Sequence, residues 1–579
     1  MRYTSTRSRT ISVSFEQALC TGYAPDHGLF VPESLPFGVL TPARLSQCWS
    51  ALSYPLLSYE VLRLFIAETE ISNVDLLQIC IASFDGFDDP SQAVPIVPLQ
   101  PKSTEQKNSN QQNNNLYMAE LFHGPTFCFK DLGMRVVIHL LRYFVARHSL
   151  RMTLLVSTTG DTGPAAVQAV AQANTPRLTL LAHYPHNQIS AFQRKQMTTC
   201  QSQYVKVVAF EGGGDDMDLP IKNILAGQKK KQQGCWSEDQ KETNEEASLL
   251  TGVNSYNIGR PLMQMVHYIW TYMRVVELER AKETENAPTT PRKQNDDGAC
   301  DSEEQPPLSL TIILPTGAMG NIAGGYMAKK MGLPVTKLIA CSNVNDISHR
   351  VIQTGQYIKS PHMIKTLSEA INVQFPYNFE RLLFYLTNQN HDLVAAWMTQ
   401  VEEDPDAVRG RNQFLLSSDW LTRLQQEFDS VSVTDDETCE TIRYFQQEYQ
   451  CVVDPHTAVA LCGARKLGYT QKCSEGARTT REETNNGSNN NNNVKKATAI
   501  LATASPCKFQ ETMMIALGEE GWLKYAQSDR FPSAAKRYVE ADEVPPILYA
   551  ADPDKILQDN QVIWEQKARQ LVAELQQCE

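Results

Sequence analysis

Lys130 is the residue of this sequence best suited to covalent chemistry, because an aromatic residue precedes it and an acidic residue follows it. It belongs to the stretch AELFHGPTFCFKDLGMRVV, residues 119–137, which continues as an apolar helical pattern. Burial beside such neighbours lowers the pKa of an amine and makes it nucleophilic. Most lysines are solvated surface charges, so from this stretch alone a solvated surface lysine is the better interpretation.

The loop TTGDTG is a second candidate for chemistry, because it follows a short apolar run and precedes an alanine-rich helical pattern. The order of strand, glycine-containing loop and helix leaves backbone N–H groups free to bind a carboxylate or phosphate. An ordinary turn capped by Asp or Thr explains the same residues equally well. The candidate anion-binding residues are Thr158, Thr159, Gly160, Asp161, Thr162 and Gly163.

The loop PTGAMGN lies between a predicted strand at 310–314 and a predicted helix at 322–331. Its glycines, Gly317 and Gly320, allow the backbone to approach a phosphate closely. The loop matches neither the dinucleotide fingerprint nor the Walker lysine pattern, so the sequence does not predict NAD or ATP.

Other polar residues give weaker signals. Thr503 and Ser505 follow another predicted strand, and open α/β sheets bind ligands at the carboxyl ends of strands. For the lone histidines, His123 and His456, a packed or turn-capping imidazole is a better interpretation than a metal ligand. The acidic stretch at 211–222 lacks the full EF-hand pattern, which favours a capped helix start over calcium binding. We predict no metal site.

The composition favours small-molecule chemistry. A chain of 579 residues, 42% of them hydrophobic, can bury a large core and is long enough for about three domain-sized units. The net charge of -12 disfavours binding to nucleic acid or to an anionic membrane surface. The 14 cysteines contain no CxxC pair and are typical of reduced thiols. Neither a secretory signal nor a membrane span is predicted, so we expect a cytoplasmic protein, with a transit peptide as the less favoured alternative.

Strand-like and helix-like segments alternate from residue 152 onward, which predicts an α/β fold with parallel sheets. Apolar residues at helical spacing between positions 53 and 84 predict a small helical domain before it. Polar segments with little to bury read as insertions, at 102–115, 228–249, 279–307 and 474–496. The expected units are an amino-terminal domain (1–98), catalytic α/β domains (116–515, with a smaller subdomain near 130–210) and a helical tail (516–579).

Ten short segments together form a recognisable pattern: ELFHGPTFCFKD, TTGDTG, QMTT, NSYN with a following Arg, PTGAMGN, GLPV, SNVND, NFERLL, DPHTAVAL and TASPCKF. Their sequences and their order resemble those of the threonine synthase family. The opening, YTSTR and FEQALCTGYAPDHGLFVPESLP, is similar to that family's amino-terminal domain. The likeness therefore runs from about Tyr3 to Phe509 and leaves out the polar insertions and the tail.

The resemblance implies a pyridoxal-phosphate (PLP) enzyme of fold type II, with the cofactor between two parallel-sheet α/β domains. It implies that Lys130 forms the Schiff base and later moves protons, that the glycine loop holds the cofactor phosphate, and that Thr503 meets the pyridine nitrogen. The implied cofactor-binding residues are Lys130, Gly317, Ala318, Met319, Gly320, Asn321 and Thr503. The substrate-binding candidates are Thr158, Thr159, Asp161 and Thr162 for the carboxylate, with Lys195 and Arg260 added from their charge as partners of a departing phosphate.

The implied activity is that of a lyase acting on a phosphate ester. A threonine synthase converts O-phosphohomoserine and water to threonine and phosphate by γ-elimination and β-hydration. The expected ligand is therefore a small phosphorylated amino acid, with neither nucleic acid nor a membrane as partner. We expect a monomer or a homodimer.

Three departures from the family pattern leave the outcome of the reaction open. Ala318 replaces the first Asn of PTGNFGN, Ser505 replaces the His of TAHPAKF, and Thr159 replaces the Ser of TSGDTG. These changes resemble the threonine synthase-like branch, whose phospholyases release 2-oxobutyrate, ammonia and phosphate from phosphorylated hydroxy amino acids. The phospholyase is therefore the alternative function. A non-catalytic relative is a third reading, disfavoured because the lysine of FKD is present.

Overall fold

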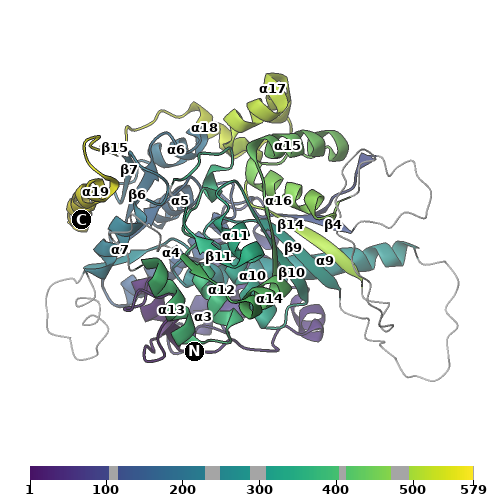
Figure 1. The fold of residues 1–579 in the computed structure, drawn as a ribbon, viewed down its shortest axis with the longest axis horizontal. Helices are drawn as coiled ribbons and strands as arrows, with labels where there is room; N and C mark the ends of the chain where they lie inside the picture. Colours follow the sequence, from purple (N-terminus) through teal and green to yellow (C-terminus); the bar gives the residue numbers. More distant parts are fainter. Residues whose placement is uncertain are drawn as a thin grey trace.

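Two β-sheets form the frame of the protein, one of six strands and one of five, and helices cover both (Figure 1). Two further sheets have two strands each, β1–β2 and β11–β12. The frame is seen in a computed structural model, which describes residues 1–102, 115–227, 248–286, 308–360, 362–402, 413–470 and 495–577.

The six-stranded sheet has the order β13-β10-β9-β14-β4-β3. Its strands pair in parallel, except that β3 runs antiparallel to β4 at the edge. In the same order, the strands are Phe428–Ser432, Val335–Ser342, Ser309–Pro315, Lys496–Ala502, Leu116–Glu120 and Ile96–Pro98.

The five-stranded sheet is parallel throughout, in the order β15-β7-β6-β5-β8. Its strands are Ile547–Tyr549, Val205–Phe210, Leu178–Pro185, Arg151–Ser157 and Ser248–Gly252. The central strands are almost wholly buried, as expected of parallel strands with helices on both faces. The parallel α/β fold predicted from the alternation of segments is therefore confirmed, with one antiparallel edge strand that the pattern did not reveal.

The helices of the first half are α1 (Phe15–Thr21), α2 (Tyr54–Leu62), α3 (Asn73–Ser83), α4 (Lys130–Arg147), α5 (Thr162–Ala173), α6 (Ala191–Thr198), α7 (Asp218–Ala226) and α9 (Gly259–Asn286). Those of the second half are α10 (Gly320–Lys330), α11 (Ile347–Thr354), α12 (Phe379–Leu386), α13 (His391–Glu402), α14 (Ser418–Glu427), α15 (Asp435–Tyr449), α16 (Pro455–Lys466), α17 (Gln510–Ala526), α18 (Lys536–Glu540) and α19 (Leu557–Gln576). None of the described helices is long and apolar enough to cross a membrane.

The amino-terminal part contains the helices expected between residues 53 and 84, and also the β1–β2 pair, Tyr3–Ser5 with Phe30–Pro32. It packs directly on the larger body. The ring of Tyr54 in α2 lies 5.3 Å from that of Trp270 in the long helix α9, and both rings are buried. Residues 96–98, which we assigned to this part, instead form β3 in the six-stranded sheet.

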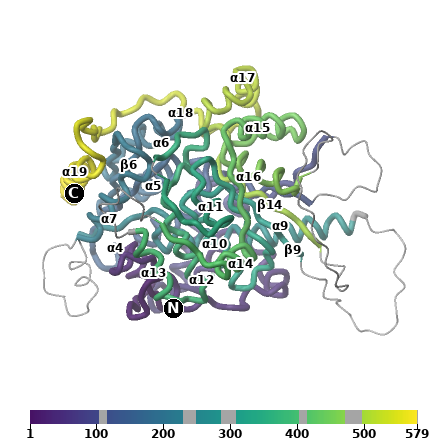
Figure 2. Tube along the Cα trace, viewed as in Figure 1, coloured from purple at the N-terminus to yellow at the C-terminus, as the bar shows by residue number. Residues whose placement is uncertain are grey.

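We predict a helical tail after residue 516, but the structure shows that the tail also contains a strand. It runs from α17, on the side of the six-stranded sheet, past α18 to α19, on the side of the five-stranded sheet (Figure 2). On the way, Ile547–Tyr549 forms β15 and pairs in parallel with β7. Buried Trp564 of α19 then packs on Phe210 at the end of β7. The smaller subdomain predicted near 130–210 therefore also includes β8 and part of the tail.

The predicted insertions are shorter than expected, because regular elements extend into their ends. Residues 248–249 open β8, Lys496 opens β14, and 279–286 form the last turns of α9. The helix continues there because buried Glu279 accepts hydrogen bonds from Tyr117 and from Asn115 Nδ2 (2.8 Å) and pairs with Lys282. Residues 103–114, 228–247, 287–307 and 474–494 of these insertions lie outside the described residues.

Candidate functional site

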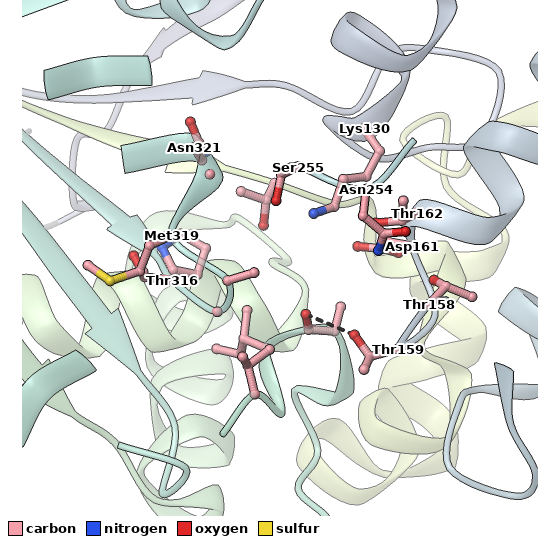
Figure 3. A pocket seen from close by; sticks show the side chains of 18 of the residues that line it. Lys130, Thr158, Thr159, Asp161, Thr162, Asn254, Ser255, Thr316, Met319 and Asn321 are labelled. Atoms are coloured by element: carbon pink, nitrogen blue, oxygen red, sulfur yellow. Dashed lines mark hydrogen bonds between the residues drawn. The ribbon is translucent and has the colours of Figure 1, made fainter. Parts of the chain in front are cut away.

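A cavity lies where the carboxyl ends of both sheets face each other (Figure 3). The five-stranded sheet contributes Ser157, the last residue of β5, and the loop that follows it. The six-stranded sheet contributes the loop after β9 and Thr503, the first residue after β14. Open α/β sheets bind their ligands at this edge, so the topology alone makes this cavity the candidate site.

Lys130 is the first residue of α4, and its side chain reaches into the cavity (Figure 3). The turn before it is bonded to the chain that leaves β14. Phe129 N donates to Thr503 O at 2.8 Å, and Ser505 N donates to Phe127 O at 3.0 Å. These two backbone bonds bring the lysine and Thr503, far apart in sequence, to the same wall.

The environment of Lys130 makes its amine unusually ready to lose a proton. Burial lowers the pKa of Lys130 to about 8, and the positive charge of Arg260 acts in the same direction, while Asp161 opposes both. The Nζ atom lies 4.3 Å from the centre of the Phe129 ring. Near neutral pH a useful fraction of this lysine is therefore the neutral, nucleophilic amine.

The loop at 317–321 is shaped to receive an anion. Met319 has a left-handed backbone (φ 61°), and α10 begins at the next residue. Within the described parts of the chain, the backbone N–H groups of residues 317–321 have no hydrogen-bond partner. A Cβ atom at Gly320 would lie 2.5 Å from Ser255 Cβ, which explains the glycine. Such a set of free N–H groups at a helix start binds phosphate.

The wall of the cavity also holds buried polar atoms without a partner in the described structure. They are Ser157 Oγ, Gln264 Oε1 and Asn321 Nδ2. An unpaired buried polar atom is costly, so such atoms in one cavity indicate that a polar ligand pairs with them.

The TTGDTG loop lines the opposite wall and leads into α5. Gly160 has φ 126°, and a Cβ atom there would collide with the Gln193 side chain. Thr158 Oγ1 accepts a hydrogen bond from Gly160 N at 3.0 Å, which tightens the loop. The Thr159 hydroxyl donates to Ala370 O at 3.2 Å (Figure 3).

Asp161 in this loop is held by a buried ion pair. Its Oδ1 lies 2.8 Å from Lys508 Nζ and accepts from Gln193 Nε2 at 3.0 Å. Burial alone would raise the pKa of Asp161, but the charge and hydrogen bond of Lys508, with nearby His456 and Lys130, together lower it. Burial likewise opposes the charge of Lys508, whose pKa is nevertheless raised by Asp161.

The cavity contains most of the site residues predicted from the sequence. The residues that line it are Lys130, Thr158, Thr159, Asp161, Thr162, Gly317, Ala318, Met319, Gly320, Asn321 and Thr503. Ser505 differs, because its hydroxyl lies 3.4 Å from the Tyr525 hydroxyl and does not line the cavity.

Lys195 and Arg260 are not brought to the cavity, so the structure does not support them as partners of a departing phosphate. Lys195 Nζ donates to Val539 O at 2.9 Å, because its face of α6 meets the carboxyl-terminal segment. Arg260 is buried beneath α4 and donates to Val253 O at 3.1 Å. Formal charge indicated these residues, but side-chain direction decided against them.

Several lining residues were missed by sequence reasoning. Asn254 holds the end of β5 in place, because its amide donates to Ser157 O at 2.7 Å. The polar cluster NSYN was a usable signal for it, and the acidic loop after β7 was a signal for two carboxyl groups. The missed residues include Asn254, Ser255, Tyr377, Asp215, Asp218, Ala370 and His456.

Comparison with known proteins gives a consistent answer. The family model "Threonine synthase N terminus" matches residues 2–84. "Threonine synthase-like 2" of Pongo abelii is 32% identical over 517 residues, which cover 89% of each chain.

Solved structures extend the similarity to the whole fold. The crystal structure of threonine synthase from yeast has a TM-score of 0.73 and 27% identity, covering 98% of this chain and 99% of the yeast chain. The PLP-bound threonine synthase from Brucella melitensis has a TM-score of 0.68 and 26% identity, covering 97% and 99%. The fold is therefore the predicted fold type II architecture, and the chain belongs to the threonine synthase family.

Proposed function

We propose that this protein is a PLP-dependent enzyme that converts O-phosphohomoserine and water to threonine and phosphate. The observation that carries the proposal is the shared cavity of Lys130, the free N–H groups of residues 317–321 and the Thr503 hydroxyl. An amine with a pKa of about 8, an anion-binding loop and a hydroxyl suit the aldehyde, the phosphate and the ring nitrogen of PLP.

The residues present fit this cofactor. The loop at 317–321 would hold its phosphate through backbone N–H groups, and the glycines allow the close approach. Lys130 would bind its aldehyde carbon, and Thr503 would offer a hydroxyl to its ring nitrogen. When bound, PLP supplies the electron sink that carbanion chemistry at the α and β carbons of an amino acid requires.

The chain itself would move the protons and orient the substrate. Lys130, with a pKa of about 8, can both accept and return a proton near neutral pH. The Thr158–Thr162 loop, at the N-terminus of α5, suits the substrate carboxylate. Ile371 and Val373 add apolar surface to the lining of the cavity.

The departing phosphate would leave past two carboxyl groups. Burial raises the pKa of Asp215 to about 6, and it raises the pKa of Asp218 well above its ordinary value. At neutral pH Asp215 is still mostly ionised, so only Asp218, whose pKa is raised further, would carry less negative charge and repel a phosphorylated substrate less. Lys195 and Arg260 lie elsewhere, and the N–H groups of residues 317–321 are assigned to the cofactor phosphate. Lys130 is then the one lysine or arginine among the described lining residues that could stabilise the leaving group.

Product analysis tests the proposal. The purified holoenzyme would be incubated with O-phosphohomoserine, and phosphate, threonine and 2-oxobutyrate would be measured together, with K130A as the inactive control. We expect phosphate and threonine in equal amounts. Absence of phosphate release would refute the proposal.

A phospholyase that releases 2-oxobutyrate, ammonia and phosphate is the second candidate. One observation favours it: Ala318 lines the cavity with a methyl group where the family pattern has an amide. Ser505, the other departure, does not line the cavity. If 2-oxobutyrate forms, A318N should move the product toward threonine, whereas S505H is the comparison variant from which we expect little change.

A further inference from the structure

The segment of residues 363–374, here called the clasp, lines the cavity and is bonded to the five-stranded half. Ala370 O accepts the Thr159 hydroxyl at 3.2 Å, at the carboxyl end of β5 (Figure 3). Gln374 N donates to Asp215 Oδ2 at 2.8 Å, after the carboxyl end of β7. The clasp therefore holds the loop that the proposed function assigns to the substrate carboxylate.

The clasp is bonded equally to the six-stranded half. Leu367 N donates to Asp435 Oδ1 at 3.1 Å, just after β13. Ala370 N donates to His456 Nε2 at 3.1 Å, in the first turn of α16. Ala370 thus uses its N–H toward one half of the molecule and its carbonyl toward the other.

The chemistry of His456 suits this contact. The imidazole is buried, and its Nδ1 lies 2.9 Å from Asp454 Oδ1. A carboxylate accepts, so Nδ1 carries the proton and Nε2 keeps its lone pair for the Ala370 N–H. Asp454 is itself fixed, because it caps α16 by accepting from the backbone N of His456 and of Thr457 at 2.9 and 3.2 Å.

We propose that His456 is a positioning residue, which fixes Ala370 and through it holds Thr159 and the substrate-carboxylate loop across the cavity. The inference rests on the proposed function only for the identity of the ligand. The path Asp454, His456, Ala370, Thr159 joins the two halves by hydrogen bonds alone. Loss of the acceptor at His456 should therefore loosen the clasp and weaken substrate binding, while the contacts of the cofactor remain.

The first test needs neither substrate nor turnover. Hydrogen exchange, followed by mass spectrometry, would compare the holoenzyme of wild type, H456L and H456Q. In H456L we expect exchange in a peptide that contains Ala370 to become about tenfold faster. Strands β5 and β9 should not change. Gln keeps an acceptor at this position, so H456Q should recover a large part of the protection.

The second test separates substrate binding from cofactor binding. For H456L and T159V we expect KM for O-phosphohomoserine to rise about tenfold with a smaller change in kcat. The imine absorbance band should keep its position and intensity. T159V removes only the hydroxyl, and it carries the test if H456L does not fold.

Two results would overturn the inference: unchanged exchange in the clasp of a folded H456L, or a KM increase accompanied by loss of the imine band. If the wild type releases no phosphate from O-phosphohomoserine, the proposed function fails. The exchange measurement still decides the role of His456 in that case.

Discussion

Lys130, half-buried in the cavity wall, and fully buried Lys508 both lie near Asp161, yet their protons are held in opposite ways. Burial and the charge of Arg260 lower the pKa of Lys130 to about 8. Lys508 lies 2.8 Å from Asp161, and this charge raises its pKa in spite of burial. Burial therefore makes a reactive amine only where no carboxylate is in contact. A carboxylate in contact thus distinguishes the structural lysine from the reactive one.

Among the variants that test this comparison, removal of Lys130 should have the largest effect on activity. K130A should lose the imine absorbance band and all measurable turnover of O-phosphohomoserine, because no other lysine lines the cavity among the described residues. Absorbance spectra and phosphate release would measure both effects. K195A is the matched control, since Lys195 contacts the carboxyl-terminal segment. Turnover by K130A would contradict the assignment.

Removal of Lys508 should instead lower the free energy of unfolding. K508M leaves Asp161 buried with only Gln193 as a side-chain donor among its described contacts, and breaking such a pair costs about 3–5 kcal/mol. Urea unfolding would measure the loss. Without Lys508, burial raises the pKa of Asp161, so the unfolded state binds fewer protons and the loss should be larger at pH 7.5 than at pH 5.

The double variant K508M/D161N supplies the control for this prediction, because it removes the unpaired charge. We expect it to recover part of the stability. If K508M unfolds at the same urea concentration as the wild type, the ion pair has no structural role.

The smallest expected effect concerns the pH dependence of Lys130. Imine formation requires the neutral amine, so its rate in apoenzyme mixed with PLP should rise with pH, with a midpoint near 8. In R260M the midpoint should move upward, because one cause of the lowered pKa is removed. R260K keeps the charge and should stay near the wild type. A midpoint unchanged in R260M would show that the charge of Arg260 does not lower the pKa of Lys130.

Local sequence was enough to predict the parallel strands and the two loops at their carboxyl ends. Strands 205–210 and 310–314 could be read because buried parallel strands are short apolar runs bounded by turns. Strands β3 and β15 could not be predicted from the sequence in this way. Each has three residues, and each is a strand only because a neighbouring strand, β4 or β7, offers its edge.

The same division applies to the cavity. Lys130, the glycine loops and Thr503 lie in segments whose residue types carry their chemistry, so the sequence and its family resemblance were sufficient to identify them. Four other residues contact the cavity or not according to where their side chains point after distant segments pack together. They are Lys195, Arg260, Ser505 and His456. Composition carries no information about that direction, and only the tertiary structure turns Arg260 beneath α4, Ser505 toward Tyr525 and His456 toward Ala370.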